Sequence, residues 1–116
     1  MLKVGSIVMG VSDVRRATAF WTEALGYVPR ADADDTWALL SPASGAGPNV
    51  SLDLSETPWQ ERPRVHLDLY SDDQAAEVER LLGLGASTVD WEYPSDADFV
   101  VLADTEGNRF CVIAPG

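Results

Sequence analysis

Cysteine and histidine are scarce in this chain of 116 residues, which contains only Cys111 and His66. A single cysteine excludes an intramolecular disulfide and a cysteine-based zinc site, and it suits a reducing compartment. One histidine, in a chain without a Gly-x-Ser-x-Gly motif, gives no support for a serine-hydrolase site. The sequence also lacks a glycine-rich phosphate-binding motif. Few side chains therefore remain as candidates for chemistry.

Basic residues and long apolar runs are scarce as well. Only 8 Lys and Arg stand against 19 Asp and Glu, so the formal net charge of -11 predicts that a nucleic acid is not a partner. No apolar stretch approaches the roughly 20 residues that span a bilayer, and no basic-then-apolar leader opens the chain. We therefore expect a cytoplasmic protein without a membrane partner. The acidic charge serves either solubility or the attraction of a cationic ligand.

An apolar content of 46% and four tryptophans predict one ordered domain with its own core. Apolar periodicity and turn residues predict its elements in order. The first half reads as a strand at 3–11, a helix at 14–25, an extended stretch at 27–29, a polar turn at 31–35, and strands at 36–40 and 50–54. After a connector at 55–63, the second half reads as a strand at 64–70, a helix at 74–82, an extended stretch at 86–91, and strands at 99–102 and 110–113.

The two halves repeat one pattern at a distance of about 60 residues. Helix caps Asp13 and Asp73 correspond, and so do Gly45 and Gly107 in the later turns. Each half therefore reads as a βαβββ module, at 1–58 and 59–116, within a single α+β domain. A sheet with one helix leaves a face uncovered, so we expect the modules to form a curved, mixed, mainly antiparallel sheet around a cavity. Such a cavity is the default ligand site.

Several short motifs connect this pattern with a known family. They are Val11-Ser-Asp and Leu25-Gly-Tyr in the first half, and His66-Leu-Asp-Leu, Leu84-Gly-Ala and the stretch from Ala103 to Cys111 in the second. The chain resembles the vicinal oxygen chelate superfamily, which includes glyoxalase I, extradiol dioxygenases, and fosfomycin and bleomycin resistance proteins. It is most similar to short glyoxalase-like proteins common in actinobacteria. The resemblance implies the glyoxalase/bleomycin resistance fold and a homodimer.

The resemblance also implies where a divalent metal binds in the enzymes of this superfamily. A residue on the first strand of each half and a glutamate on the last strand hold the ion, and these positions fall on Ser6, His66 and Cys111. Only His66 matches, because neutral serine is a poor ligand and a thiol must ionise before it binds zinc. Asp53 could join His66 if its side of the strand faces inward. We therefore expect that no cofactor is bound. If a divalent metal does bind, His66 is the residue that would hold it.

Each candidate residue also has a purely structural interpretation. Cys111 reads as a small buried residue or as a reactive thiol, and His66 as part of a pocket wall, a polar anchor or a general base. Three roles are open for Trp37, Trp59 and Trp91. They can belong to the core, stack on a planar ligand, or face a cation. The stretch 104–108 reads as a hairpin turn, because Gly107 can adopt a positive φ.

Two functions stay open on the sequence. The first is the binding of a small organic molecule, cationic or aromatic, in an aromatic-lined cavity without a complete metal triad, as in a protein that sequesters a drug or toxin. Its ligand-binding candidates are Ser6, Trp37, Asp53, Trp59, Trp91 and Cys111. The second is a metal-dependent lyase or dioxygenase with His66 as its catalytic residue. Convergence of Ser6, His66 and Cys111 on one cavity would favour the enzyme.

Overall fold

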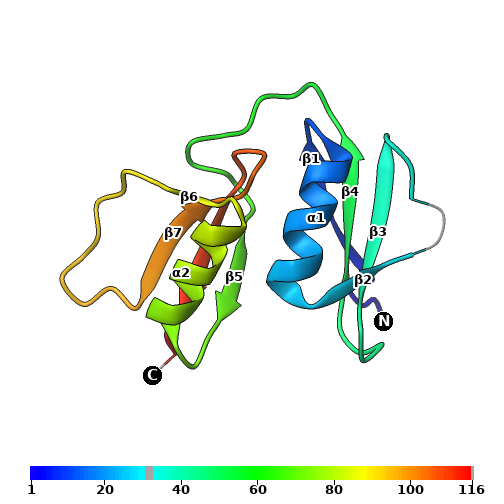
Figure 1. Ribbon diagram of the computed structural model, residues 1–116. Helices are drawn as coiled ribbons and strands as arrows, with labels where there is room; N and C mark the ends of the chain where they lie inside the picture. Colours follow the sequence, from blue (N-terminus) through cyan, green and yellow to red (C-terminus); the bar gives the residue numbers. More distant parts are fainter. Residues whose placement is uncertain (31–32, 116) are drawn as a thin grey trace. The chain divides into compact units, whose positions relative to one another are not determined.

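Two successive βαβββ units make up the chain, as the internal repeat predicts. The computed structural model describes residues 1–30 and 33–115. It divides into the compact units Met1–Pro58 and Trp59–Gly116, each with one helix and one four-stranded sheet (Figure 1). The α+β class and the mixed sheets of the sequence prediction are thus confirmed. Both helices, with 12 and 11 residues, are too short to cross a membrane.

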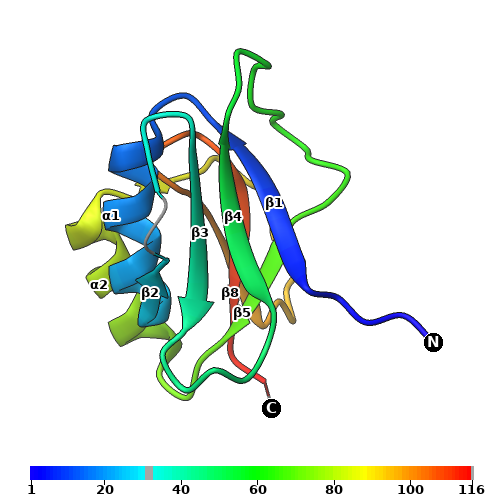
Figure 2. The same cartoon turned by 90° about the vertical axis from the view of Figure 1, so that its right-hand side faces the viewer.

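The first unit contains the strands β1 (Ser6–Val11), β2 (Tyr27–Pro29), β3 (Trp37–Pro42) and β4 (Asn49–Leu54), and the helix α1 (Val14–Leu25). Its strands are ordered β1-β4-β3-β2, with β1 parallel to β4 and the other pairs antiparallel. Figure 2 shows α1 against one face of this sheet. The buried side chains of α1, including Phe20 and Trp21, form a core with Leu40 and Leu52 of the strands. The opposite sheet face has no helix of this unit over it.

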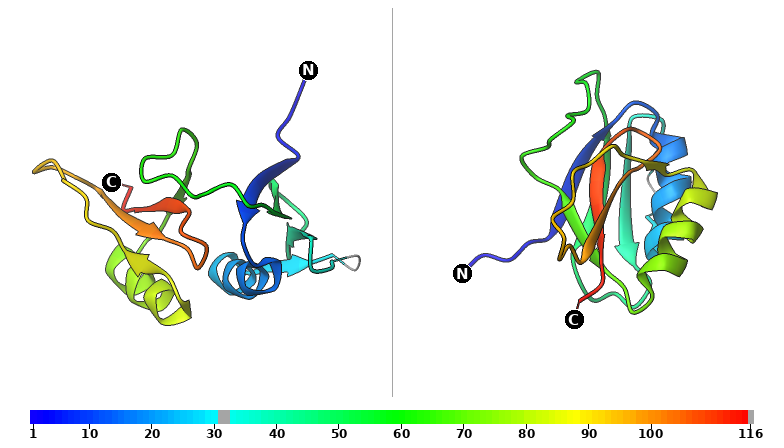
Figure 3. Two further views of the ribbon diagram at one scale, coloured as in Figure 1. Left: turned by 90° about the horizontal axis from the view of Figure 1, so that it is seen from above. Right: turned by 90° about the vertical axis from the view of Figure 1, so that its left-hand side faces the viewer.

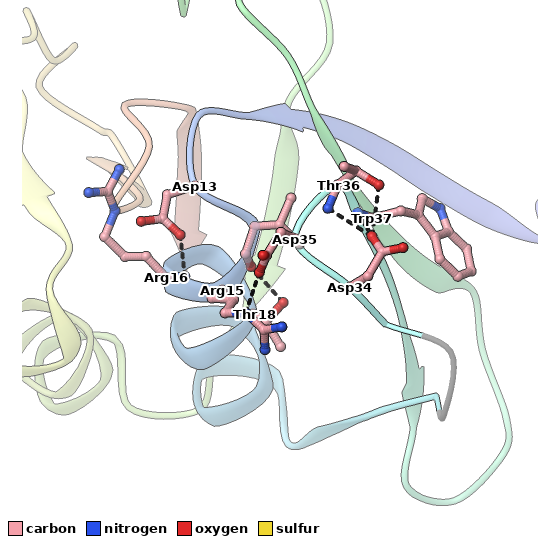
Figure 4. Close-up of polar contacts among 9 residues, drawn as sticks. Asp13, Arg15, Arg16, Thr18, Asp34, Asp35, Thr36 and Trp37 are labelled. Carbon is pink, nitrogen blue, oxygen red and sulfur yellow. Dashed lines mark hydrogen bonds and ion pairs between the residues drawn. The ribbon is translucent and has the colours of Figure 1, made fainter.

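Local contacts explain where α1 and β3 begin. Asp13 caps α1 by accepting a hydrogen bond from the Arg16 backbone N–H at 3.0 Å (Figure 4). Of the predicted polar turn, residues 31 and 32 lie outside the described residues. In its described part Asp34 accepts hydrogen bonds from the Thr36 hydroxyl at 2.7 Å, the Thr36 N–H at 2.8 Å and the Trp37 N–H at 3.0 Å. These bonds, the Thr36 hydroxyl first, lower the pKa of Asp34 below its ordinary value.

The second unit contains β5 (Leu67–Tyr70), α2 (Gln74–Leu84), β6 (Ser87–Thr88), β7 (Phe99–Ala103) and β8 (Arg109–Ile113). Its strand order, β5-β8-β7-β6, repeats that of the first unit, again with one parallel pair, β5 with β8. Asp73 caps α2, and Gly85 ends it in the left-handed conformation with a φ of 118°. The predicted hairpin turn is confirmed, because Asp104 accepts hydrogen bonds from the Glu106 and Asn108 N–H groups at 2.8 and 2.9 Å.

Two predicted strands and one predicted extended stretch are shorter in the structure than expected. The first begins at Ser6 rather than at residue 3, because its partner β4 begins at Asn49, the residue opposite Ser6. The strand predicted from residue 64 begins at Leu67, which pairs with Phe110. Its partner β8 begins only one residue earlier, at Arg109, so residues 64 and 65 have no strand residue opposite them. His66 therefore directly precedes β5. The stretch 86–91 contributes only Ser87 and Thr88 to the sheet. Beyond that short pairing, the Val101 N–H donates to the Tyr93 hydroxyl at 2.8 Å instead of to a neighbouring strand.

Candidate functional site

One face of the second sheet carries the residues that can do chemistry. Asp68 on β5 pairs with Cys111 on β8, and Cys111 pairs with Val101 on β7, so these three side chains form a row on one face. The alternate residues of β8, Phe110 and Val112, are buried on the other face. There α2 lies against the sheet, as Figure 3 shows in its left view. The row is therefore on the face that α2 leaves open.

This open face lines a cavity of about 450 Å³ in the second unit. Its apolar wall is formed by Pro63, Trp91, Phe99, Val101 and Ile113, and Phe110, whose side chain is buried on the other face, also borders it. Its polar groups are Arg62, His66, Asp68, Arg109 and Cys111. Predominantly apolar walls with a few polar groups, in a space of roughly 300–1,000 Å³, are typical of sites for small organic ligands. The arrangement is thus suited to hold a molecule with an apolar body and one polar end.

His66, Asp68 and Cys111 meet at one end of the polar lining. The His66 Nε2 lies 3.0 Å from Asp68 Oδ1, and a possible donor atom of each of the three residues lies within 4.8 Å of the others. His66 and Asp68 are half-exposed, at 44% and 47%, whereas Cys111 is only 9% exposed. Asp68 thereby orients the imidazole, which can act as a polar anchor or as a proton acceptor.

Cys111 remains a thiol at neutral pH. Burial, the negative charge of Asp68 and a hydrogen bond to Asp68 raise its pKa from 9.0 to about 11. A thiol with such a pKa carries almost no thiolate at pH 7 and is therefore a poor nucleophile. The structural interpretation of Cys111 as a small residue of the wall accordingly fits better than that of a reactive thiol.

Two arginines of this unit stack on two of the predicted tryptophans. The Arg62 guanidinium lies 4.6 Å from the centre of the Trp91 ring, and the Arg109 guanidinium 4.3 Å from that of Trp59. Trp91 lines the cavity, whereas Trp59 lies outside its lining, against Gly107 of the β7–β8 turn. Each indole thus faces a cation that belongs to the protein itself.

The other predicted ligand-binding residues lie in the first unit. Ser6, Asp53 and Trp37 occupy one face of its sheet, because Gly10 pairs with Asp53, Asp53 pairs with Trp37, and Ser6 lies four residues before Gly10 on β1. The Ser6 hydroxyl forms a hydrogen bond with the Ser51 hydroxyl at 2.6 Å. Asp53 is exposed and Trp37 is half-buried. Their part in ligand binding stays a prediction.

Three polar residues of the cavity lining were not singled out from the sequence. Asp68 lies two residues after His66, so the alternation of the strand was a signal that both share a face. Arg109 lies two residues before Cys111 and shares its face for the same reason. Arg62 belongs to the irregular connector, where no periodicity indicates the direction of a side chain. Sequence reasoning could therefore have found the first two.

The metal implied by the superfamily can be tested against these donor atoms. An imidazole nitrogen, a carboxylate oxygen and a sulfur form a set of three that zinc accepts at catalytic sites, where a fourth position stays open. All three lie within reach of one another, but a metal must displace the Cys111 proton, which is held with a pKa of about 11. These three donors therefore fit a zinc-like ion. At a pH below about 11 the ion competes with the Cys111 proton, which lowers its affinity.

Comparisons with known proteins agree with the fold. Among solved structures, the chain is similar to a fosfomycin resistance protein from Listeria monocytogenes, with a TM-score of 0.77, 17% identity, and coverage of 100% of this chain and 93% of that one. An antibiotic-binding protein from Streptomyces sp. CB03234 has a TM-score of 0.69 and 23% identity over 100% and 98% of the two chains. A possible glyoxalase from Bacillus cereus has a TM-score of 0.74 and 15% identity over 98% and 100%.

None of the curated proteins matches the sequence significantly. The Listeria protein has also been solved in a mutant form with Mn(II) and 1S,2S-dihydroxypropylphosphonic acid. Residues 6–113 match the family model of the glyoxalase-like domain, which therefore spans nearly the whole chain. This chain belongs to the glyoxalase-like domain family.

Proposed function

We propose that this protein binds a small organic molecule with an aromatic or flat apolar body in the cavity of its second unit, and so sequesters it. The observation that carries the proposal is the cavity itself, because Trp91, Phe99, Val101 and Ile113 offer apolar area on the open sheet face beside His66. The antibiotic-binding protein among the structural neighbours is consistent with such a role. In this proposal His66 and Cys111 contact the ligand, and Ser6, Asp53 and Trp37 stay candidates from the first unit.

Burial of the ligand's apolar surface supplies the driving force. Each Å² of apolar surface removed from water contributes about 25 cal/mol, before the entropy of association is subtracted. A two-ring aromatic compound is small enough for a cavity of about 450 Å³. We therefore expect weak to moderate affinity for simple naphthalene derivatives, sufficient for calorimetric titration.

A variant that fills the cavity tests this proposal. Ile113 is half-buried in the lining, so Ile113→Trp adds bulk inside the cavity. Val28 is an exposed apolar residue on the edge strand β2, so Val28→Trp is the matched control. Isothermal titration with 2-naphthoate and 2-naphthylmethanol should show binding to the wild type and the control and a loss of at least about tenfold in Ile113→Trp. Equal binding by all three proteins would refute the site.

The cluster of His66, Asp68 and Cys111 supports a second candidate function, that of a metal-dependent lyase or dioxygenase. These residues would hold the ion, and a divalent ion bound there would supply a Lewis acid beside the cavity. In this alternative His66 is both a metal ligand and the residue on which catalysis depends.

Cobalt substitution distinguishes the two candidates without an activity assay. After incubation with Co(II) and removal of free ion, retained metal at one equivalent per chain with a thiolate-to-cobalt absorption band would establish the metal site. His66→Ala should abolish retention and Cys111→Ser should abolish the band. Absence of retained Co(II), Zn(II) and Mn(II) at pH 8 would remove the second candidate.

We also propose that the chain forms a homodimer, as the family resemblance implies. Several large apolar side chains are exposed on the strands, among them Val8, Leu54 and Tyr70. Light scattering coupled to gel filtration should give twice the chain mass of 12.5 kDa, and a mass of 12.5 kDa would contradict the proposal.

A further inference from the structure

Two arginines line the cavity of a strongly acidic protein. The chain has 8 basic residues against 19 acidic ones, yet the cavity lining contains Arg62 and Arg109 and only one carboxylate, that of Asp68. Asp68 is already engaged by His66 at 3.0 Å and by the Cys111 thiol. The local balance of charge is therefore the opposite of the charge of the whole chain.

Neither arginine is paired with a carboxylate in the part of the chain that the structure describes. Arg15 and Arg80, by contrast, form ion pairs with Asp35 and Glu77. Arg62 has the Trp91 ring beside it and no hydrogen-bond acceptor among residues 1–30 and 33–115. Both cavity guanidinium groups therefore remain available to an anionic ligand.

The geometry of stacking keeps these groups available. A guanidinium that lies on an indole face loses access to one side of its plane, but its N–H groups point outward within the plane. Such a fork matches the two oxygens of a carboxylate or the oxygens of a phosphonate or sulfonate. Stacking also limits the rotamers of the side chain, so less entropy is lost when an anion binds.

Arg109 adds a second observation that points to an anion. One of its terminal nitrogens donates to the Gly107 carbonyl at 2.8 Å. Its Nε–H is buried and has no acceptor in the described part of the chain. A buried donor on a charged group without a partner is costly, and an anion or a water molecule commonly supplies the missing acceptor.

From these observations we infer that the cavity selects an aromatic ligand that carries an anionic group, with Arg62 and Arg109 as the residues that determine this specificity. The inference rests on the proposed binding function and gives the chemical class of its ligand. It replaces the cationic ligand that the net charge of -11 suggested, because a cation in this cavity would lie beside two arginines. The apolar wall holds the ring, and the guanidinium groups hold the carboxylate or an equivalent oxyanion.

Three ligands with one ring system and different charge test the inference: 2-naphthoate, 2-naphthylmethanol and 2-naphthylmethylammonium. Isothermal titration of the wild type should show about tenfold tighter binding of the anion than of the alcohol, since hydrogen bonds to charged groups are stronger than neutral ones. The ammonium compound should bind more weakly than the alcohol. The preference for the anion should weaken at high salt, because Arg62 is exposed to solvent.

Arginine variants assign the preference to residues. Arg62→Gln and Arg109→Gln should each reduce the ratio of the affinity for the anion to the affinity for the alcohol by severalfold. Arg64→Gln is the matched control, because Arg64 is an exposed arginine two residues from Arg62 and outside the cavity lining. Arg62 is exposed, so its variant should fold even if Arg109→Gln does not.

The outcomes separate this inference from the proposed function. An anion-to-alcohol affinity ratio that falls in Arg62→Gln but not in Arg64→Gln supports the inference. If the wild type binds the three ligands with equal affinity and Ile113→Trp binds none of them, the inference is overturned but the proposed binding site is supported. Binding of none of them, or binding that Ile113→Trp does not affect, overturns the proposed function and this inference with it.

Discussion

Gly107 should be one of the most sensitive positions in the second unit. It has a φ of +88°, and a Cβ placed there would lie 2.5 Å from Trp59 Cδ1 and 2.6 Å from Trp59 Cγ. Alanine at this position therefore suffers two separate penalties, one from the left-handed backbone and one from the overlap with the indole. The Arg109 guanidinium lies beside the same ring, so a displaced Trp59 also loses its cation–π contact.

Gly45 is the matched control, since it is the counterpart of Gly107 in the internal repeat. Its φ of +77° carries the same backbone penalty, but no atom lies within 4 Å of the position of its Cβ. We expect Gly45→Ala to lower the free energy of unfolding by about 1–2 kcal/mol. Gly107→Ala should cost about 1–3 kcal/mol more, the usual penalty of forcing an extra group into an occupied space.

Urea denaturation followed by circular dichroism measures both variants, and the Trp59→Ala background isolates the indole. Without the ring, the cost of Gly107→Ala should fall to that of Gly45→Ala, a coupling of more than about 1 kcal/mol in the double-mutant cycle. Equal destabilisation by the two glycine variants in the wild type would refute the reasoning. A cost of Gly107→Ala that Trp59→Ala does not change would refute it as well.

Two further predictions follow from the titratable groups. Cys111 has a folded pKa of about 11 against 9.0, so its contribution to stability is present below pH 9 and is lost as the pH rises through 11. The free energy of unfolding should fall by up to about 3 kcal/mol more in the wild type than in Cys111→Ala over this range. Identical pH profiles would contradict the raised pKa. For Asp34, carbon NMR should show a carboxyl pKa below the ordinary value of 3.8. Thr36→Val should raise this pKa, because the Thr36 hydroxyl is the main hydrogen-bond donor to the carboxylate. An unchanged pKa of Asp34 in this variant would contradict that role of Thr36.

The architecture could be predicted because its signals are local and repeated. Asp13 and Asp73 mark the starts of the two helices, and Gly26 and Gly85 mark their ends with positive φ angles. Strand positions followed from apolar alternation, which depends only on neighbouring residues. Strand ends were less accurate, because a strand ends where its pairing ends, as β1 does at Ser6 opposite Asn49, the first residue of β4. Pairing between distant residues leaves no local mark in one sequence.

The candidate site was only partly accessible to sequence reasoning. His66 and Cys111 were singled out by residue type and family resemblance, and the structure brings them together in the second unit. Arg62 was missed because the connector has no periodicity from which to derive the direction of its side chain. Net charge could not indicate the charge of the cavity lining, since it averages over the surface, whereas a ligand meets the few groups that line one cavity.

Mapping of a bound ligand by NMR tests the central claim most directly. The ¹⁵N-labelled protein is titrated with 2-naphthoate, and the shifted amide and indole N–H signals are assigned. Binding in the proposed cavity predicts shifts concentrated on β7, β8 and Trp91, with the Arg109 Nε–H among the most affected signals. Shifts confined to residues 1–58, or the absence of shifts at millimolar ligand, would contradict the account.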